Sequence, residues 1–305
     1  MIKVFGHKAP DTDSTGSPLI WAWYLSDVRK TPAKAVLQGM PNTEAVWMLG
    51  KWGVSMPEII EDVAPGDQCV IVDTNNPAEL PASLDQAEVI EIIDHHLLAG
   101  GITTRTPINI TVRPLACTAT IMHDLMGADL DRAPAWVKGL MLTCILSDTL
   151  EFRSPTTTPH DRRVAEKLAK DLDIAIPSYA MEMFTAKSDV SAFSDTALLK
   201  MDSKEYTLGG KQMRISVLET TAPQVLLDRK DRLVAAMPAV AAEDGADEVM
   251  LFIVDILNEQ STLLVPNDFV RRVAEASFGV PVEGDSVVLP GVVSRKKQII
   301  PVLKV

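Results

Sequence analysis

Residues 91–96, EIIDHH, end a hydrophobic run with an aspartate and two adjacent histidines. The run at 89–93 is rich in valine and isoleucine, which is typical of a buried β-strand. The whole chain holds only five histidines, and two of them stand together here. Ligands of open parallel sheets bind at the carboxyl ends of strands, so this segment indicates both a parallel sheet and a site at its edge.

The segments before EIIDHH repeat this pattern and define the first part of the fold. Strand-like runs at 2–6, 35–38 and 69–72 alternate with longer helical patterns. This alternation predicts a mostly parallel, doubly wound sheet that is covered on both faces. Thr158 followed by Pro159 predicts a helix start, with one apolar face that closes the first domain: Val164, Ala165, Leu168, Ala169 and Leu172.

The character of the sequence changes after the polar stretch KSDVSAFS at 187–194. Strand-like runs follow at 198–206 and 213–218 around Gly209-Gly210, and then a predicted helix at 223–242 and an apolar strand at 249–256. We therefore expect two α/β domains, the second smaller and with a mixed sheet. The expected boundaries are 1–187, a hinge linker at 188–194, and 195–305.

Composition limits the classes of function. The chain has 305 residues, 47% of them hydrophobic, and a formal net charge of -12, which argues against general binding of nucleic acids. It shows no apolar stretch long enough to span a membrane, so we expect a soluble, cytoplasmic protein. Cys69, Cys117 and Cys144 lack metal-ligand spacing and are expected to be buried, reduced thiols.

Polar residues follow several of the predicted strands and one apolar helical run. Taken singly, each has an ordinary explanation: Asp73 could cap a turn, and Asp148 could be a buried, hydrogen-bonded carboxylate. The candidates are His7, Asp11, Asp13, Asp73, Asp94, His95, His96 and Asp148. Together at one sheet edge, these carboxylates would repel one another unless cations neutralised them.

Divalent metal ions would supply that neutralisation. Six ligands are enough for two ions if one carboxylate bridges them: His7, Asp11, Asp13, Asp73, His95 and Asp148. A mixture of imidazole and carboxylate without thiolate favours manganese or a similar first-row ion over a structural zinc, although zinc stays open on chemistry alone.

Five separated motifs carry a family resemblance. GHKAPDTD, VDTN, DHH and SDT occur in the order and approximate spacing of the DHH phosphoesterase superfamily. SRKKQIIP at 294–301 resembles the signature of one branch, the family II manganese-dependent inorganic pyrophosphatases. Other branches typically end in a domain with a glycine-rich GGGH-like motif, and no such motif occurs after residue 194.

The resemblance implies a role for each matched position. His7, Asp11 and Asp73 would hold one metal ion, while Asp13, Asp73, His95 and Asp148 would hold the other, with Asp73 as the bridge. Asp94 would orient a ligand or the neighbouring backbone. The residues expected to contact the substrate are His96, Lys204, Arg295 and Lys296.

The implied activity is hydrolysis of pyrophosphate by a metal-activated water, in a cleft between the two domains of a homodimeric enzyme. The implied cofactors are two Mn²⁺ ions per subunit, with Co²⁺ as a possible substitute, and Mg²⁺ that accompanies the substrate. One alternative is an exopolyphosphatase or a phosphodiesterase of short oligonucleotides or dinucleotides, but only 5% of residues are aromatic and could stack bases. A non-catalytic sensing module is a weaker alternative, because the chain leaves no room for an inserted nucleotide-binding domain.

Overall fold

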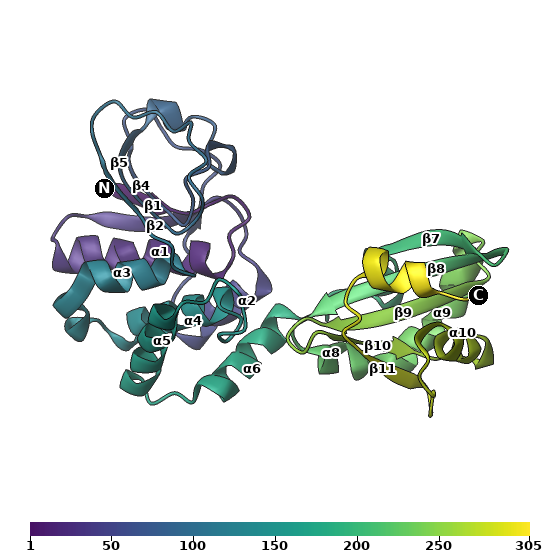
Figure 1. Cartoon of the computed structure of the whole chain (residues 1–305). Helices are drawn as coiled ribbons and strands as arrows, with labels where there is room; N and C mark the ends of the chain where they lie inside the picture. The colour runs from purple at the N-terminus through teal and green to yellow at the C-terminus, as the bar shows by residue number, and fades with distance from the viewer. The chain divides into compact units, whose positions relative to one another are not determined.

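The structure is a computed structural model that describes all residues from Met1 to Val305. The chain forms two compact units, Met1–Lys187 and Ser188–Val305, each with its own sheet (Figure 1). No helix in either unit has the length and apolar character needed to cross a membrane. The role of residues 188–194 as a hinge stays a prediction.

A six-stranded parallel sheet in the order β3-β2-β1-β4-β5-β6 forms the centre of the first unit. Its strands are β1 (Ile2–Phe5), β2 (Ala33–Leu37), β3 (Glu58–Ile59), β4 (Gln68–Val72), β5 (Glu88–Asp94) and β6 (Asn109–Val112). The strand order reverses direction between β1 and β4, and such a switch point is where ligands of open α/β sheets bind. The predicted parallel sheet is confirmed, while β3 and β6 were not predicted.

Long helices gather on one face of this sheet. They are α1 (Thr12–Trp23), α2 (Thr43–Lys51), α3 (Thr118–Met126), α4 (Ala135–Asp148), α5 (Pro159–Asp171) and α6 (Ile176–Lys187), with the short helices η1 (Tyr24–Val28) and η4 (Gly127–Arg132). Helix α4 packs between α1 and α5 and is buried along most of its length, which explains why it is apolar on all sides. The predicted helix after Thr158 is confirmed as α5, which begins with a capping box formed by Thr158 and Asp161.

The opposite face of the sheet is covered by connections without long helices. The links that follow β4 and β5 contain only the short turns η2 (Pro77–Glu79) and η3 (Leu84–Gln86). Leu80, Leu84 and Ile102 from these links pack on Phe5, Ile71 and Ile92 of the sheet. Both faces are therefore buried, as the apolar strands predict, but the two layers differ in thickness.

The second unit has a five-stranded mixed sheet in the order β11-β10-β9-β8-β7. Its strands are β7 (Ser203–Leu208), β8 (Lys211–Thr220), β9 (Glu248–Asp255), β10 (Gln260–Leu264) and β11 (Ser286–Pro290), and only the β8–β9 pair is parallel. Helices α7 (Asp195–Met201), α8 (Pro223–Leu227) and α9 (Lys230–Asp244) contribute to one apolar cluster. Helix α10 (Asp268–Phe278) and the C-terminal turns η5 (Arg295–Ile299) and η6 (Ile300–Val302) contribute to another.

Two predictions for this unit are wrong in part. The expected strand at 198–206 begins only at Ser203, because Ser194 caps helix α7 and this helix buries Leu198 and Leu199. The expected helix at 223–242 is two helices, α8 and α9. The break lies at Arg229, whose guanidinium group donates to Asp195 and to the carbonyl oxygens of Val190 and Phe193.

We predict that Gly139→Ala in α4 destabilises the first unit. A Cβ atom at Gly139 would lie 2.1 Å from the ring of Trp52, which is held by hydrogen bonds to Tyr179 and Thr143. Overpacking of this kind costs about 1–3 kcal/mol and outweighs the better helix propensity of alanine. Gly50→Ala in α2 is the matched control, because nothing lies within 4 Å of its added Cβ atom. Urea unfolding of both variants measures the difference, and an undiminished free energy of unfolding for Gly139→Ala would contradict the prediction.

Candidate metal centre

The predicted ligand residues follow three neighbouring strands of the first sheet. His7 comes two residues after β1 ends, Asp73 directly follows β4, and His95 and His96 directly follow β5. Because β4 pairs with both β1 and β5, these side chains meet at one edge of the sheet. The fold thus collects them from positions far apart in the sequence.

The first group contains His7, Asp11 and Asp73, whose potential ligand atoms lie within 4.8 Å of one another. Nε2 of His7 is 3.6 Å from Oδ2 of Asp73 and 3.7 Å from Oδ1 of Asp11. The other ring nitrogen, Nδ1, donates to the carbonyl oxygen of Lys8 at 2.7 Å. This bond orients the ring, because a carbonyl oxygen only accepts and so leaves Nε2 facing the two carboxylates.

Two local features hold this first group in place. Asp11 is the N-cap of α1, and its Oδ1 accepts from the backbone N–H of Ser14 at 2.9 Å. The hydroxyl of Ser14 accepts from the backbone N–H of His7 at 2.8 Å. Gly6 permits this close approach, since a Cβ atom there would lie 1.9 Å from Oγ of Ser14.

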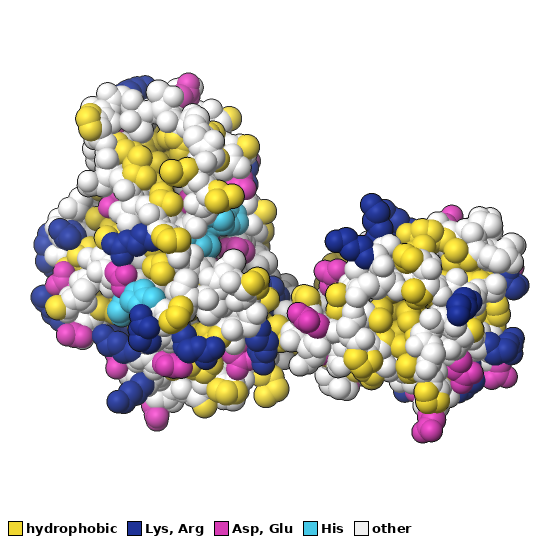
Figure 2. Space-filling model, viewed as in Figure 1, with side chains coloured by type: hydrophobic (Ala, Val, Ile, Leu, Met, Phe, Trp, Pro, Cys, Tyr) yellow, Lys and Arg dark blue, Asp and Glu magenta, His cyan; other side chains and the backbone are white.

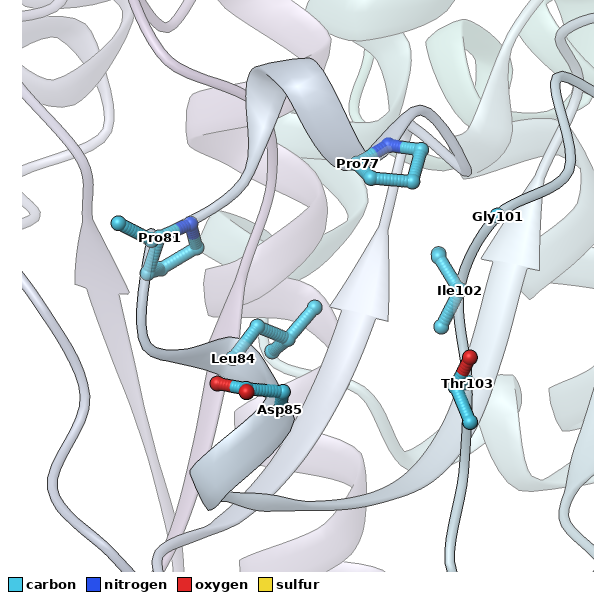
Figure 3. Close-up of a pocket in the computed structure, with 8 residues that line it drawn as sticks. Pro77, Pro81, Leu84, Asp85, Gly101, Ile102 and Thr103 are labelled. Carbon is cyan, nitrogen blue, oxygen red and sulfur yellow. The ribbon is translucent and has the colours of Figure 1, made fainter.

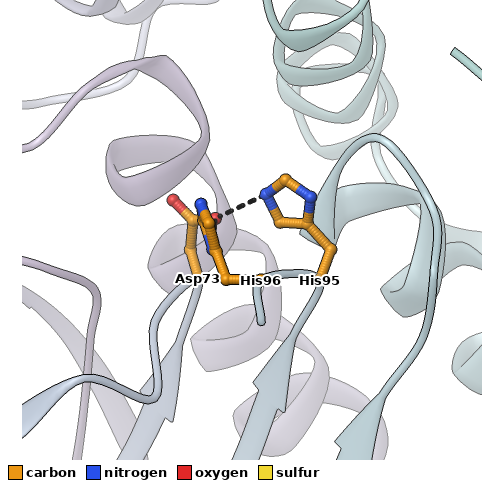
Figure 4. Close-up of side chains that lie close together, drawn as sticks. All are labelled: Asp73, His95 and His96. Carbon is orange, nitrogen blue, oxygen red and sulfur yellow. Dashed lines mark ion pairs between the residues drawn. The ribbon is translucent and has the colours of Figure 1, made fainter. Parts of the chain in front are cut away.

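The second group contains Asp73, His95 and His96 (Figure 4). Nε2 of His95 is 3.3 Å from Oδ1 of Asp73, and Nδ1 of His95 donates to the carbonyl oxygen of Leu115. Asp73 therefore turns one carboxylate oxygen toward His7 and the other toward His95. Its backbone has a positive φ of 59°, a conformation that is uncommon for residues other than glycine and often occurs at functional sites.

The third group contains Asp13, Asp148 and the thiol of Cys117. Asp13 lies in the first turn of α1 and accepts from Oγ of Ser17 at 2.6 Å and from the backbone N–H of Thr118 at 2.7 Å. The hydroxyl of Thr118 also donates to Oδ1 of Asp73 at 3.2 Å, which links this group to the others. Asp148 is the last residue of α4, and its Oδ2 is enclosed without a hydrogen-bond partner.

The charges of these groups fit bound cations. Burial, reinforced by the charges of Asp13 and Asp11, raises the pKa of Asp73 well above its usual value. Burial and the charges of Asp13 and Asp73 do the same to the pKa of Asp148. Burial opposes protonation of His7, but its hydrogen bonds to Asp11 and to the Lys8 carbonyl and the charge of Asp73 raise its pKa to about 9. Protons thus compensate the negative charge where divalent ions would otherwise do so.

The structure therefore brings together all six residues that were predicted as metal ligands. An enclosed carboxylate oxygen without a partner and an acidic residue at a helix C-terminus are both unfavourable without a nearby cation. The donor set of imidazole and carboxylate groups suits manganese or a similar ion. The assignment of individual ligands to individual ions stays a prediction.

The position of Cys117 was not predicted from the sequence. It is buried, as predicted for all three cysteines, but it also lies beside Asp13 and Asp148. Burial raises the pKa of this thiol well above its usual value, so the group is neutral. No second cysteine lies at a metal-binding spacing from Cys117. Only its position directly before the start of α3 could have indicated that it lies near the site.

Asp94 supports the segment that carries both histidines. Its Oδ1 accepts from the backbone N–H groups of His95 and His96 and from Nδ1 of His96, at 2.8, 3.1 and 2.9 Å. This matches the supporting role that was expected for Asp94. The hydrogen bond to Asp94 raises the pKa of His96, a half-exposed side chain, and so favours a cationic imidazolium that attracts anions.

The contacts of Asn75 were likewise not predicted from the sequence. Its amide group donates to Oδ2 of Asp94 at 2.5 Å and to the carbonyl oxygen of Leu97 at 2.9 Å. Its Oδ1 accepts from the backbone N–H of Ala99 at 2.7 Å. Asn75 thereby ties the end of β4 to the segment after β5, and the VDTN motif was the only signal for it.

The predicted substrate residues other than His96 belong to the second unit. Lys204 lies on β7 opposite Ile215, and cross-strand partners point to the same face of a sheet. That face carries the cluster of Ile215, Met213 and Ile299, which includes the C-terminal segment. Arg295 and Lys296 begin η5 in this same segment. Lys204, Arg295 and Lys296 thus lie on or beside one face of the second sheet.

Two cavities lie away from these residues. One, of about 210 Å³, lies between the η2–η3 connection and residues 101–103 and has Pro77, Leu84 and Ile102 among its lining residues (Figure 3). The other, of about 570 Å³, lies at the start of α5 beside Phe152 and Arg162. Neither is lined by a predicted site residue.

Comparisons with known proteins cover the whole chain. Residues 1–147 match the N-terminal domain of the DHH family, and residues 181–305 match the DHHA2 domain. Two curated relatives bear the name "Probable manganese-dependent inorganic pyrophosphatase". The protein from Deinococcus radiodurans is 38% identical over 100% of this chain and 98% of its own length. The protein from Lactobacillus helveticus is 35% identical over 98% of this chain and 96% of its own.

Solved structures agree with these relatives. A crystal structure described as "Methanococcus jannaschii putative family II inorganic pyrophosphatase" has a TM-score of 0.61 and 34% identity, and covers 99% of this chain and 97% of that one. An exopolyphosphatase-related protein from Bacteroides fragilis has a TM-score of 0.52 at 12% identity, which shows a shared fold alone. Full-length identity above 30% and matches to both domains lead to one conclusion: the chain belongs to the family II, manganese-dependent inorganic pyrophosphatases of the DHH superfamily.

Proposed function

We propose that this protein hydrolyses inorganic pyrophosphate to two phosphates. The observation that carries this proposal is the position of Asp73, whose two carboxylate oxygens face His7 on one side and His95 on the other. A carboxylate in this position can bridge two metal ions. The printed names of the full-length relatives support pyrophosphate as the substrate and manganese as the metal.

In this proposal, the metal ions are held by residues 1–187. His7, Asp11 and Asp73 would hold one Mn²⁺, and Asp13, Asp73, His95 and Asp148 would hold the second. Two such ions, when bound, would lower the pKa of a bound water toward neutrality and so supply the nucleophile. Four carboxylates balance the charge of two divalent ions, which leaves the centre able to accept an anionic substrate. Co²⁺ is a possible substitute, and Mg²⁺ enters with pyrophosphate.

Residues 195–305 supply the cations that hold the phosphates. Arginine can bind two phosphate oxygens at once and lysine acts as a point charge, which suits Arg295, Lys296 and Lys204 to this role. His96, whose pKa is raised by its hydrogen bond to Asp94, would donate to a phosphoryl oxygen from the metal-binding side. Residues 188–194 act as the hinge. The homodimer and the cytoplasmic location expected from the sequence stay predictions, and light scattering tests the first.

The substrate is tested by phosphate release after loading with Mn²⁺. Pyrophosphate, longer polyphosphates and a dinucleotide should be assayed in parallel at matched concentrations. We expect pyrophosphate to give the highest kcat/KM, because the three cations of the second unit and a metal pair suit a short, compact polyanion. A clear preference for the dinucleotide or for long polyphosphate would make the pyrophosphatase proposal wrong.

Metal binding and phosphate binding should be separable by mutation. Asp73→Asn removes the bridging charge, so it should lower metal content after dialysis and reduce kcat by at least about 100-fold. Arg295→Ala should keep both metal ions but weaken transition-state binding by about 2–5 kcal/mol, measured as kcat/KM. Asp85→Asn is the control for Asp73→Asn, since Asp85 is an exposed aspartate away from the predicted ligands. Loss of metal from Arg295→Ala, or full metal content and activity in Asp73→Asn, would contradict this division.

The metal-free protein should lose stability as pH rises. The pKa of His7 is raised to about 9 in the folded state, and the pKa values of Asp73 and Asp148 are raised above those of the unfolded chain. Each raised pKa contributes stability that is complete below the unfolded value and is lost as pH rises through the folded value. The melting temperature in EDTA should therefore fall between about pH 6.5 and about pH 9.

The stabilisation by added Mn²⁺ should increase as pH rises, because its ligands bind in their deprotonated forms. The rise in melting temperature on adding Mn²⁺ should be larger at high pH than at low pH. Melting curves with EDTA and with Mn²⁺ at each pH give both trends from one protein preparation. A constant gain from Mn²⁺ across this range would show that the three groups do not bind the metal ions.

A further inference from the structure

One residue outside the family motifs holds the guanidinium group of Arg295. Nη1 of Arg295 donates to the backbone carbonyl oxygen of Asp202 at 2.8 Å, and Nη2 donates to Oδ1 of the same residue at 2.6 Å. Only 14% of the Arg295 side chain is exposed, although it lies near the C-terminus. A single aspartate, 93 positions earlier in the sequence, thus fixes the direction of this side chain.

Asp202 is itself fixed by the second sheet. It lies between the end of α7 at Met201 and the start of β7 at Ser203. Its carbonyl oxygen also accepts from the backbone N–H of Val217 in β8 at 2.8 Å. Arg295 is therefore anchored to the sheet and not only to its own turn.

The anchor places Arg295 beside the strand that carries Lys204. Lys204 comes two residues after Asp202 and points to the sheet face that carries Ile299. In Figure 1 the C-terminal turns η5 and η6, in yellow, lie along β7 and β8. The contact between Arg295 and Asp202 thus joins two of the three proposed phosphate-binding cations on one rigid surface.

Other side chains of the SRKKQ segment shape its backbone. Oγ of Ser294 accepts from the backbone N–H of Lys297, and Oε1 of Gln298 accepts from the N–H groups of Val293 and Ser294. Nε2 of Gln298 donates to the carbonyl oxygen of Gly291. These bonds hold the turn, but only Asp202 is bonded to the guanidinium group.

The geometry leaves Arg295 able to bind an anion. A guanidinium group has five N–H donors, and Asp202 takes one from each terminal nitrogen, so three remain. The side chain of Asp202 is 54% exposed, so water screens its charge and the arginine keeps much of its attraction for anions. An arginine that is already ordered loses less conformational entropy when it binds a phosphate.

We propose that Asp202 is a positioning residue that aims Arg295 at the phosphates of the substrate. It acts through Arg295 and does not itself contact the substrate. This inference rests on the proposed function, in which Arg295 binds pyrophosphate.

The test uses Asp202→Ala and Asp202→Asn in the Mn²⁺-loaded, full-length protein. Asp202→Ala should raise the KM for pyrophosphate by about tenfold, the effect of losing one hydrogen bond to a charged group. Asp202→Asn should have a smaller effect, because the amide oxygen can still accept from Nη2. Metal content and melting temperature should stay unchanged in both variants, since a half-exposed ion pair contributes little stability.

The matched control is Asp285→Ala. Asp285 also lies in the second unit, has a side chain that is 62% exposed, and pairs with Lys230 at 2.6 Å. Its loss removes an ion pair of the same length and similar exposure away from Arg295, so the KM for pyrophosphate should not change. An equal rise of KM in Asp285→Ala would mean that the effect is a general loss of surface charge, and would overturn the proposal.

A double variant decides whether Asp202 acts through Arg295. If it does, adding Asp202→Ala to Arg295→Ala should leave KM where Arg295→Ala alone sets it. The proposal is overturned if Asp202→Ala raises KM equally in both backgrounds, leaves it unchanged in the wild-type background, or lowers it. If Arg295→Ala alone leaves KM unchanged, its proposed phosphate-binding role fails together with the inference. If only Asp202→Ala is without effect, the proposed function stands and the positioning role fails.

Discussion

Repulsion among carboxylates that are crowded at one sheet edge is the constraint on which the first unit depends. Asp13 and Asp73 are almost fully buried, and Asp148 has an enclosed oxygen without a partner. Backbone and hydroxyl donors from Ser17 and Thr118 satisfy part of their hydrogen-bonding capacity, but none of these donors carries a positive charge. Such an arrangement persists only with protons or cations in place, so a divalent ion bound here would also stabilise this unit.

This crowding arises at the ends of ordinary strands and helices. Asp11 caps α1, Asp73 follows β4, His95 follows β5, and Asp148 ends α4. Because the order of the strands reverses direction between β1 and β4, the segments after these strands diverge and leave room between them. The positions of the predicted ligands are therefore set by strands and helices that bury apolar residues, and short side chains would suffice to reach a metal ion.

These predicted ligands can be located from the sequence because each lies near an apolar strand or helix that periodicity identifies. It cannot predict the contacts of Thr118 with Asp13 or of Asp202 with Arg295, which join segments 105 and 93 residues apart. The expected strand at 198–206 was wrong at its start because the short apolar run Leu198-Leu199 is compatible with a helix as well as with a strand. The N-cap at Ser194 favours the helix. The position of Cys117 beside the predicted ligands was not foreseen, because no second cysteine stands at a metal-binding spacing from it.

An acidic chain that binds a polyanion must keep its cations from being neutralised by its own carboxylates. The net charge of -12 makes this a real difficulty, and Arg295 does lie against a carboxylate. The partner is half-exposed and accepts from the two terminal nitrogens of the guanidinium group, so it orders the arginine while water weakens its charge. Lys204 and Lys296 are exposed, and no carboxylate forms an ion pair with either. The second unit thus presents an ordered arginine and two lysines without ion-pair partners beside one sheet face, which supplies local positive charge in an acidic chain.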